Sequence, residues 1–211
     1  LAGWDGRFDT TSVGAGLWRE FIATFSNADL MDAGPLWKEP FDDRDPLGTP
    51  SGLSDDPGLS DRLTAAARAL RSAGFDIDTP LGEMQRADRN GVLVPIHGGF
   101  GSEGVSNVVS SGANGTTSEA GLPRGDRLDG TALRTDGYPV SYGTSFIYDV
   151  EFTAAGPVAE ALLTYGETGD PTSEYFADQT VMFSNKQWRP IRFTVADIES
   201  DPALRAYAVG E

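Results

Sequence analysis

Apolar residues in the first third of the chain recur every three or four positions, which is the spacing of one face of an α-helix. The first such stripe consists of Leu17, Trp18, Phe21, Ile22 and Phe25. Ser12 precedes this stripe and is predicted to cap the helix, because its hydroxyl can accept a free N–H group of the first turn. A second stripe predicts a helix over residues 59–73, with Ser60 as its cap and Gly74 as its end.

The second half of the chain instead carries short apolar runs bounded by glycine and proline, a pattern typical of β-strands. These runs cover residues 92–96, 140–142, 145–152 and 159–165. The first follows Gly91 and is predicted to be a buried strand. The last two flank the turn at 155–157 and are predicted to form an antiparallel hairpin. Their nearly continuous apolar character favours strands that are covered on both faces.

Two further helices are predicted near the end of the chain. Ser173 is a plausible cap for a helix that runs to about residue 183, and residues 194–197 resemble a capping box. Segments 34–58 and 98–137 are rich in glycine and polar residues and are predicted to be loop-rich. Helices early in the chain and antiparallel strands late predict the α+β class.

The charge of the chain narrows its possible partners. It has 211 residues, of which 32 are acidic and 16 are basic, so its formal net charge is −16. Such a field repels phosphate groups, which makes nucleic acids and anionic membranes poor partners. Cysteine is absent, and this excludes disulfides, thiolate metal sites and cysteine nucleophiles within the chain. No apolar run is long enough to span a bilayer.

One glycine-rich segment matches the G-x-G-x-x-G pattern of dinucleotide-binding sites. It covers residues 99–104 and follows a predicted strand. A dinucleotide site also needs a helix after the glycines, so that the N-terminus of the helix meets the pyrophosphate. Val105, Val108 and Val109 follow instead, and they are poor helix formers. A structural glycine turn is the favoured interpretation.

The remaining candidate sites have ordinary structural explanations. His97 is the only histidine, and no G-x-S-x-G motif accompanies it, so a structural role is favoured over a Ser-His-Asp triad. The acidic run at 42–45 lacks the EF-hand spacing and is interpreted as a solvated loop, not a calcium site. The N-x-T sequon at 114–116 is a short match of the kind that occurs by chance. A pair of carboxylates for glycoside hydrolysis stays open, because a chain with 32 acids always offers one.

Several blocks of the sequence resemble the late part of the large subunit of penicillin-acylase-family enzymes. The family pattern of a strand, then G-Q-S-G-x-P, then S-P-H-Y-x-D-Q is matched by Gly166, Gly169, Pro171, Ser173, Asp178 and Gln179. The tail is matched by Trp188, Arg189, Pro190 and Phe193. Earlier blocks are Leu1, residues 4–7, Ser12, residues 14–15, residues 96–99 and residues 104–107. Their order and spacing reach from the first residue almost to the last.

The chain also departs from the family pattern. Glu167 stands where glutamine is usual, and Glu174 and Tyr175 stand where proline and histidine are usual. These changes put local hydrogen bonds in doubt, but not the resemblance itself. The block at 96–99 looks closer to acylases that act on acyl-homoserine lactones and on lipopeptides, such as aculeacin or echinocandin, than to phenylacetyl-specific penicillin G acylases.

The resemblance implies an N-terminal-nucleophile hydrolase with an αββα core. In that family a precursor cuts itself and exposes a serine, whose hydroxyl attacks the amide carbonyl while its own α-amine acts as the base. This chain begins with Leu1, which has no nucleophilic atom. The nucleophile and the oxyanion asparagine are therefore expected on an upstream segment. No catalytic, cofactor-binding or metal-binding residue is expected within residues 1–211.

The function implied by the resemblance is deacylation of an N-acyl compound, either an acyl-homoserine lactone or a lipopeptide. A β-lactam acylase is the alternative within this class, and a non-catalytic binding module is the alternative outside it. The implied partners are the small subunit and the rest of the large subunit of the same precursor. The implied location is periplasmic or secreted. Residues 1–211 alone are expected to be inactive and not to form an independent domain.

Overall fold

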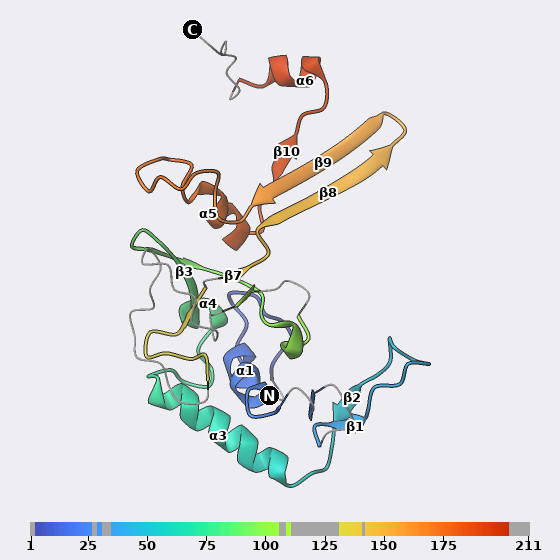
Figure 1. The fold of residues 1–211 in the computed structure, drawn as a ribbon, viewed down its shortest axis with the longest axis vertical. Helices are drawn as coiled ribbons and strands as arrows, with labels where there is room; N and C mark the ends of the chain where they lie inside the picture. Colours follow the sequence, from blue (N-terminus) through green and yellow to red (C-terminus); the bar gives the residue numbers. More distant parts are fainter. Residues whose placement is uncertain are drawn as a thin grey trace. The chain divides into compact units, whose positions relative to one another are not determined.

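The computed structural model describes residues 3–26, 29–30, 35–105, 109–110, 131–140 and 142–202. The chain divides into two compact units, Leu1–Thr144 and Ser145–Glu211. Helices and strands occur in both units, so the predicted α+β class is confirmed. Figure 1 traces the path of each unit along the chain.

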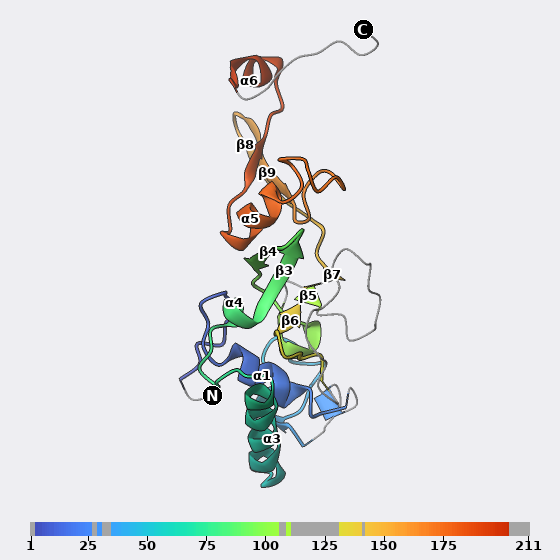
Figure 2. The same ribbon diagram turned by 90° about the vertical axis from the view of Figure 1, so that its left-hand side faces the viewer.

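The first unit is built around two packed helices, α1 (Ala15–Ile22) and α3 (Gly58–Ser72). Figure 2 shows them side by side. Both predicted helices are thus confirmed, with slightly different ends. Their facing apolar stripes form one buried cluster, which also takes residues from the later strands. Its fully buried members include Phe21, Leu36, Leu70, Met84, Leu133 and Tyr138.

The predicted serine caps of these helices are wrong, because neighbouring residues begin the helices instead. Gly14 precedes α1 with a φ of 98°, and the Ser12 hydroxyl accepts a hydrogen bond from the backbone N–H of Asp9. Ser60 lies inside α3, which begins after Pro57. The predicted end at Gly74 is confirmed. Gly74 has a φ of 86° and forms a Schellman turn, in which the N–H groups of residues 74 and 75 return to the carbonyls of residues 71 and 70.

A three-stranded sheet with the order β4-β3-β6 completes the first unit (Figure 2). The short helix α4 (Leu81–Met84) leads into β3 (Gln85–Arg89), which pairs antiparallel with β4 (Val92–Pro95) and parallel with β6 (Tyr138–Pro139). The strand predicted at 92–96 is confirmed, but its burial is not. Val92 is 61% exposed and Val94 is 5% exposed, because β4 is an edge strand with one face on the core.

Shorter strands occupy parts of the segments predicted to be loops. β1 (Trp37–Glu39) and β2 (Ser51–Leu53) form an antiparallel pair within 34–58. In the later segment the 3-10 helix η1 (Gly101–Glu103) precedes β5 (Val109–Ser110), which pairs with β7 (Tyr142–Gly143). Of the described residues in the strand predicted at 140–142, Tyr142 lies in β7, whereas Val140 follows the end of β6. The sequon at 114–116 lies outside the described residues.

The second unit contains a long hairpin formed by β8 (Phe146–Thr153) and β9 (Gly156–Leu163), as predicted. The strand β10 (Arg189–Ile191) adds to β9, so the order of the sheet is β10-β9-β8. The expectation that both faces of the hairpin are covered stays a prediction, and the two faces differ in character. Asp149, Glu151 and Glu160 interrupt one face, while the alternate positions are apolar.

Two helices follow the hairpin, α5 (Asp178–Ser184) and α6 (Val195–Ser200). Ser173 does not cap α5, which begins five residues later; its hydroxyl accepts a bond from the N–H of Tyr175 in the preceding turn. Thr194 does cap α6, because its hydroxyl accepts the N–H of Asp197 at 3.1 Å.

We expect Gly166→Ala to destabilise the second unit by about 3 kcal/mol, through a strained backbone and a steric clash. Gly166 has a φ of 83°, and an added Cβ would lie 2.4 Å from the carbonyl oxygen of Phe176. Gly169→Ala is the matched control, since a Cβ at Gly169 meets no atom within 4 Å. Thermal unfolding of the full-length protein would measure both variants. Equal melting temperatures for the two would contradict the expectation.

Candidate functional site

The first unit contains a buried charged cluster centred on Arg19 of α1. The Arg19 Nε donates to Oε1 of Glu103 at 2.7 Å, and its Nη2 donates to Oε2 of the same carboxylate at 3.1 Å. Its Nη1 donates to Oε1 of Gln85 at 2.6 Å. The side chains of Arg19 and Glu103 are only 3% and 2% exposed. This two-point geometry is the strongest form of an arginine–carboxylate pair.

The G-x-G-x-x-G segment provides the space and the carboxylate for this cluster. Glu103 lies in η1 and occupies the fifth position of the motif. A Cβ on Gly99 would lie 2.3 Å from Oε2 of Glu103, so the absence of a side chain at 99 leaves room for the carboxylate. The motif is a structural turn, as favoured from the sequence. The 3-10 helix η1 begins at the second glycine of the motif and ends before the third, Gly104, which has a φ of 84°.

Neighbouring side chains and carbonyls complete the shell of the cluster. The Gln85 Nε2 donates to the carbonyls of Ile96 and Gly98 at 2.7 and 2.8 Å, which ties β3 to the turn after β4. Three aromatic rings surround the guanidinium, whose Cζ lies 4.6 Å from the centroid of Tyr138. The rings of Phe100 and Phe8 lie at 5.5 and 5.7 Å. Such contacts stabilise a desolvated cation.

Burial and charge oppose each other at Arg19. Burial lowers the pKa of Arg19, but the adjacent Glu103 carboxylate outweighs it, so the pKa is raised above the ordinary value. The guanidinium therefore stays charged at ordinary pH.

A second carboxylate, Glu20, lies beside Arg19 in α1 and binds two hydroxyl groups. Its Oε1 accepts from the Tyr138 hydroxyl at 2.6 Å and from the Thr131 hydroxyl at 2.8 Å. Burial raises the pKa of Glu20, although the two hydroxyl donors and Arg19 act in the opposite direction. Burial and the charge of Glu20 also raise the pKa of Tyr138 well above its ordinary value.

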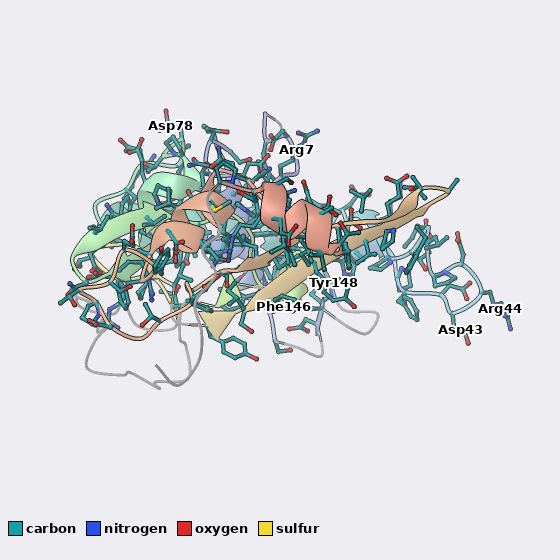
Figure 3. All side chains as sticks on the ribbon, turned by 90° about the horizontal axis from the view of Figure 1, so that it is seen from above. Arg7, Asp43, Arg44, Asp78, Phe146 and Tyr148 are labelled. Atoms are coloured by element: carbon teal, nitrogen blue, oxygen red, sulfur yellow. The ribbon has the colours of Figure 1, made fainter. Side chains whose placement is uncertain are left out.

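The positions of the other candidate residues agree with structural roles. His97 is half-buried between Ile96 and Gly98, whose carbonyls both bind Gln85. The acidic residues at 42–45 lie in the exposed loop between β1 and β2, where Figure 3 shows Asp43 and Arg44 at the tip. Asp42 and Asp45 accept N–H groups of their own loop. Within the described ranges, no group of three acidic or histidine side chains could hold a metal.

No described helix is both long enough and apolar enough to cross a membrane.

In the second unit, a hydrogen-bond network joins the residues of the family-like blocks. Gln179 at the start of α5 accepts the N–H of Leu163 at 2.8 Å and donates to Glu167 at 2.8 Å. The hydroxyl of Thr180 donates to the carbonyl of Thr164 at 2.8 Å. Glu167 also pairs with Arg189 of β10. A carboxylate at 167, in place of the usual glutamine, thus accepts from an amide and from a cation together.

Comparison with known proteins identifies the class of this chain. The penicillin amidase family model matches residues 1–200, so the chain belongs to the penicillin amidase family.

Two kinds of curated relative are similar over the whole chain. The acyl-homoserine lactone acylase PvdQ of Pseudomonas syringae pv. syringae is 32% identical over 216 residues, covering 100% of this chain and 25% of the relative. Aculeacin-A acylase of Actinoplanes utahensis is 33% identical over 214 residues, covering 100% of this chain and 23% of the relative. The match falls on a C-terminal part of these proteins. The chain thus spans about a quarter of the length of the relatives it matches.

We expect Arg19→Met to lower the free energy of unfolding by about 3–5 kcal/mol, because it leaves the Glu103 carboxylate buried without its partner. Arg192→Met is the matched control. Arg192 pairs with Asp201 at 2.9 Å, but its side chain is 39% exposed, so its loss should cost less than about 1 kcal/mol. Denaturant unfolding of the full-length protein would compare the two. The double variant Arg19→Met with Glu103→Leu should recover part of the loss; no recovery would contradict the buried-charge explanation.

We expect the stability of the Glu20→Gln variant, relative to that of the wild-type protein, to increase as the pH rises. The pKa of Glu20 is raised in the fold, so the folded protein binds more protons than the unfolded chain above the ordinary carboxyl range. The contribution of Glu20 to stability is therefore complete at low pH and is lost as the pH rises through its folded pKa. Melting temperatures of both proteins from pH 4 to 8 would show the difference growing. A difference that stayed constant would argue against the raised pKa.

Proposed function

We propose that this chain is the late part of the large subunit of an N-terminal-nucleophile amidohydrolase that removes the acyl group from an N-acyl compound. The observation that carries this proposal is the family match over residues 1–200. The names of the relatives, an acyl-homoserine lactone acylase and an aculeacin-A acylase, favour an acyl-homoserine lactone or a lipopeptide as the substrate. The proposed setting is periplasmic or secreted.

In this proposal the chemistry is carried out by residues outside this chain. A serine at the start of the large subunit attacks the amide carbonyl, and its own α-amine removes the hydroxyl proton. The α-amine suits this role because its ordinary pKa is near 8, so a fraction is unprotonated at neutral pH. The acyl group passes to the serine oxygen and the amine leaves; water then releases the acid.

The residues of this chain would support that site without touching the reacting atoms. The Arg19 cluster fixes α1, β3 and η1 against one another, and the Gln179 network fixes α5 against β9. Both are rigid elements of the kind that hold a catalytic constellation in place. The αββα arrangement, the small subunit and the self-cleaving precursor belong to the same proposal.

The direct test is to express the full-length precursor and to sequence the N-termini of the purified protein. We expect one polypeptide to begin with serine, and we expect hydrolysis of an N-acyl-homoserine lactone or of an N-acyl peptide to be lost when that serine is replaced by alanine. A protein that contains no chain beginning with serine and that hydrolyses neither substrate would favour the binding module instead.

His97→Ala should reduce stability but leave kcat of the folded enzyme within about threefold of the wild-type value. The reason is that a nucleophile assisted by its own α-amine needs no imidazole base. Active-site titration would give the folded fraction, and kcat would be compared per active site. Gln85→Leu is a control for damage to the same turn, because Gln85 binds the carbonyls on either side of His97. A loss of kcat of several orders of magnitude for His97→Ala alone would show that the imidazole is catalytic.

A further inference from the structure

The sheet of the second unit has one face that is almost entirely apolar. Antiparallel register places Phe146 opposite Leu163, Tyr148 opposite Ala161 and Phe152 opposite Pro157, and partners in register project to the same side. We call this side the apolar face; it consists of Phe146, Tyr148, Val150, Phe152, Pro157, Ala159, Ala161, Leu163 and Ile191. Arg189, opposite Ala161 on the edge strand β10, is the charged residue on this side, and it pairs with Glu167. Tyr148 is 63% exposed and Phe152 is 87% exposed, so in this chain the face is largely uncovered.

The opposite side of the same sheet, which we call the acidic side, carries three carboxylates, next to the apolar pair of Ile147 and the buried Leu162. Asp149 lies directly opposite Glu160, and Glu151 lies two residues further along β8. Two like charges directly opposite each other destabilise a sheet unless water screens them. The part of this side that carries the carboxylates is therefore suited to solvent, and Asp149, Glu151 and Glu160 are all exposed.

The apolar face is shaped as well as uncovered. Phe146 and Tyr148, both labelled in Figure 3, stack with ring centroids 5.5 Å apart. Beside them lies a concavity of about 350 Å³, lined by apolar residues that include Phe146, Ala161 and Ile191 and by the polar side chains of Gln179, Arg189 and Arg192. An exposed aromatic pair next to a hollow is typical of a surface that receives side chains from a partner.

We infer that the apolar face is the surface on which this segment docks against an apolar segment of the same precursor that lies outside these 211 residues. This inference rests on the proposed function. The relatives are about four times as long as the matched region, so they contain ample further chain to supply the occupant. A second copy of this chain is a poorer occupant, because each copy brings a net charge of −16 and the two would repel.

The test uses the full-length protein and two cysteine variants on one strand, Tyr148→Cys on the apolar face and Glu151→Cys on the acidic side. Both positions are exposed in this chain, which has no cysteine of its own. Peptide mass spectrometry would follow maleimide labelling in the native and the urea-unfolded states. We expect native Tyr148→Cys to be labelled at least 100-fold more slowly than Glu151→Cys, and the two rates to agree after unfolding. Equal native rates would overturn the inference.

A second measurement avoids any effect of the substitutions on folding. Hydroxyl-radical footprinting of the unmodified full-length protein should oxidise Phe146, Tyr148 and Phe152 at least tenfold less than it does in urea. Protection that disappears on dilution, together with a dimer in sedimentation, would overturn the inference in favour of a second copy.

Neither readout requires hydrolysis, so the two proposals can fail separately. A protected apolar face in a protein without amidase activity would reject the proposed function alone. Rapid labelling of Tyr148→Cys in an active enzyme would reject this inference alone.

Discussion

The first unit depends on a buried ion pair between Arg19 and Glu103, which lie 84 positions apart in the chain. Moving both charges out of water is costly, and their attraction offsets the cost only when the remaining donors and acceptors are also bonded. Gln85 of β3 and the carbonyl of Gly98 in the turn after β4 meet that requirement. The pair thus specifies one arrangement of α1, β3 and η1, because any other leaves a charge buried alone.

Within its described residues, the second unit is stabilised by backbone and side-chain hydrogen bonds instead of a buried ion pair. Its sheet is stabilised within the unit by the hairpin register, by β10 and by the Gln179 bonds, all of which act along strand edges and ends. Most of the two broad faces is exposed in this chain, although Leu162 on one of them is buried. One face carries aromatic and aliphatic side chains and the other carries carboxylates. An apolar partner would therefore cover the first face and not the second.

The sequence predicted the elements that depend on local patterns and missed the contacts that depend on distant ones. The stripe around Phe21 and the end at Gly74 follow from spacing and from the left-handed preference of glycine, and both were confirmed. The predicted caps at Ser12 and Ser60 were wrong. The Ser12 hydroxyl binds the N–H of Asp9, and Ser60 lies inside α3. The cluster of Arg19, Glu103 and Gln85 was not predicted, because no short sequence pattern marks residues that lie so far apart in the chain. The one available signal was Glu103 inside the glycine motif, where its charge was overlooked.

The difference between the two faces of this sheet also bears on the order in which the protein is synthesised and folds. Polypeptides are made from the N-terminus, and earlier segments begin to fold while later ones are still being synthesised. On the proposed function, the segment that covers the apolar face belongs to the earlier part of the precursor, so it already exists when this sheet leaves the ribosome. Its aromatic residues then need to remain uncovered only briefly, and the acidic side keeps neighbouring chains apart during that interval. Order of synthesis would thereby protect a surface that, if it were made first, would be prone to aggregation.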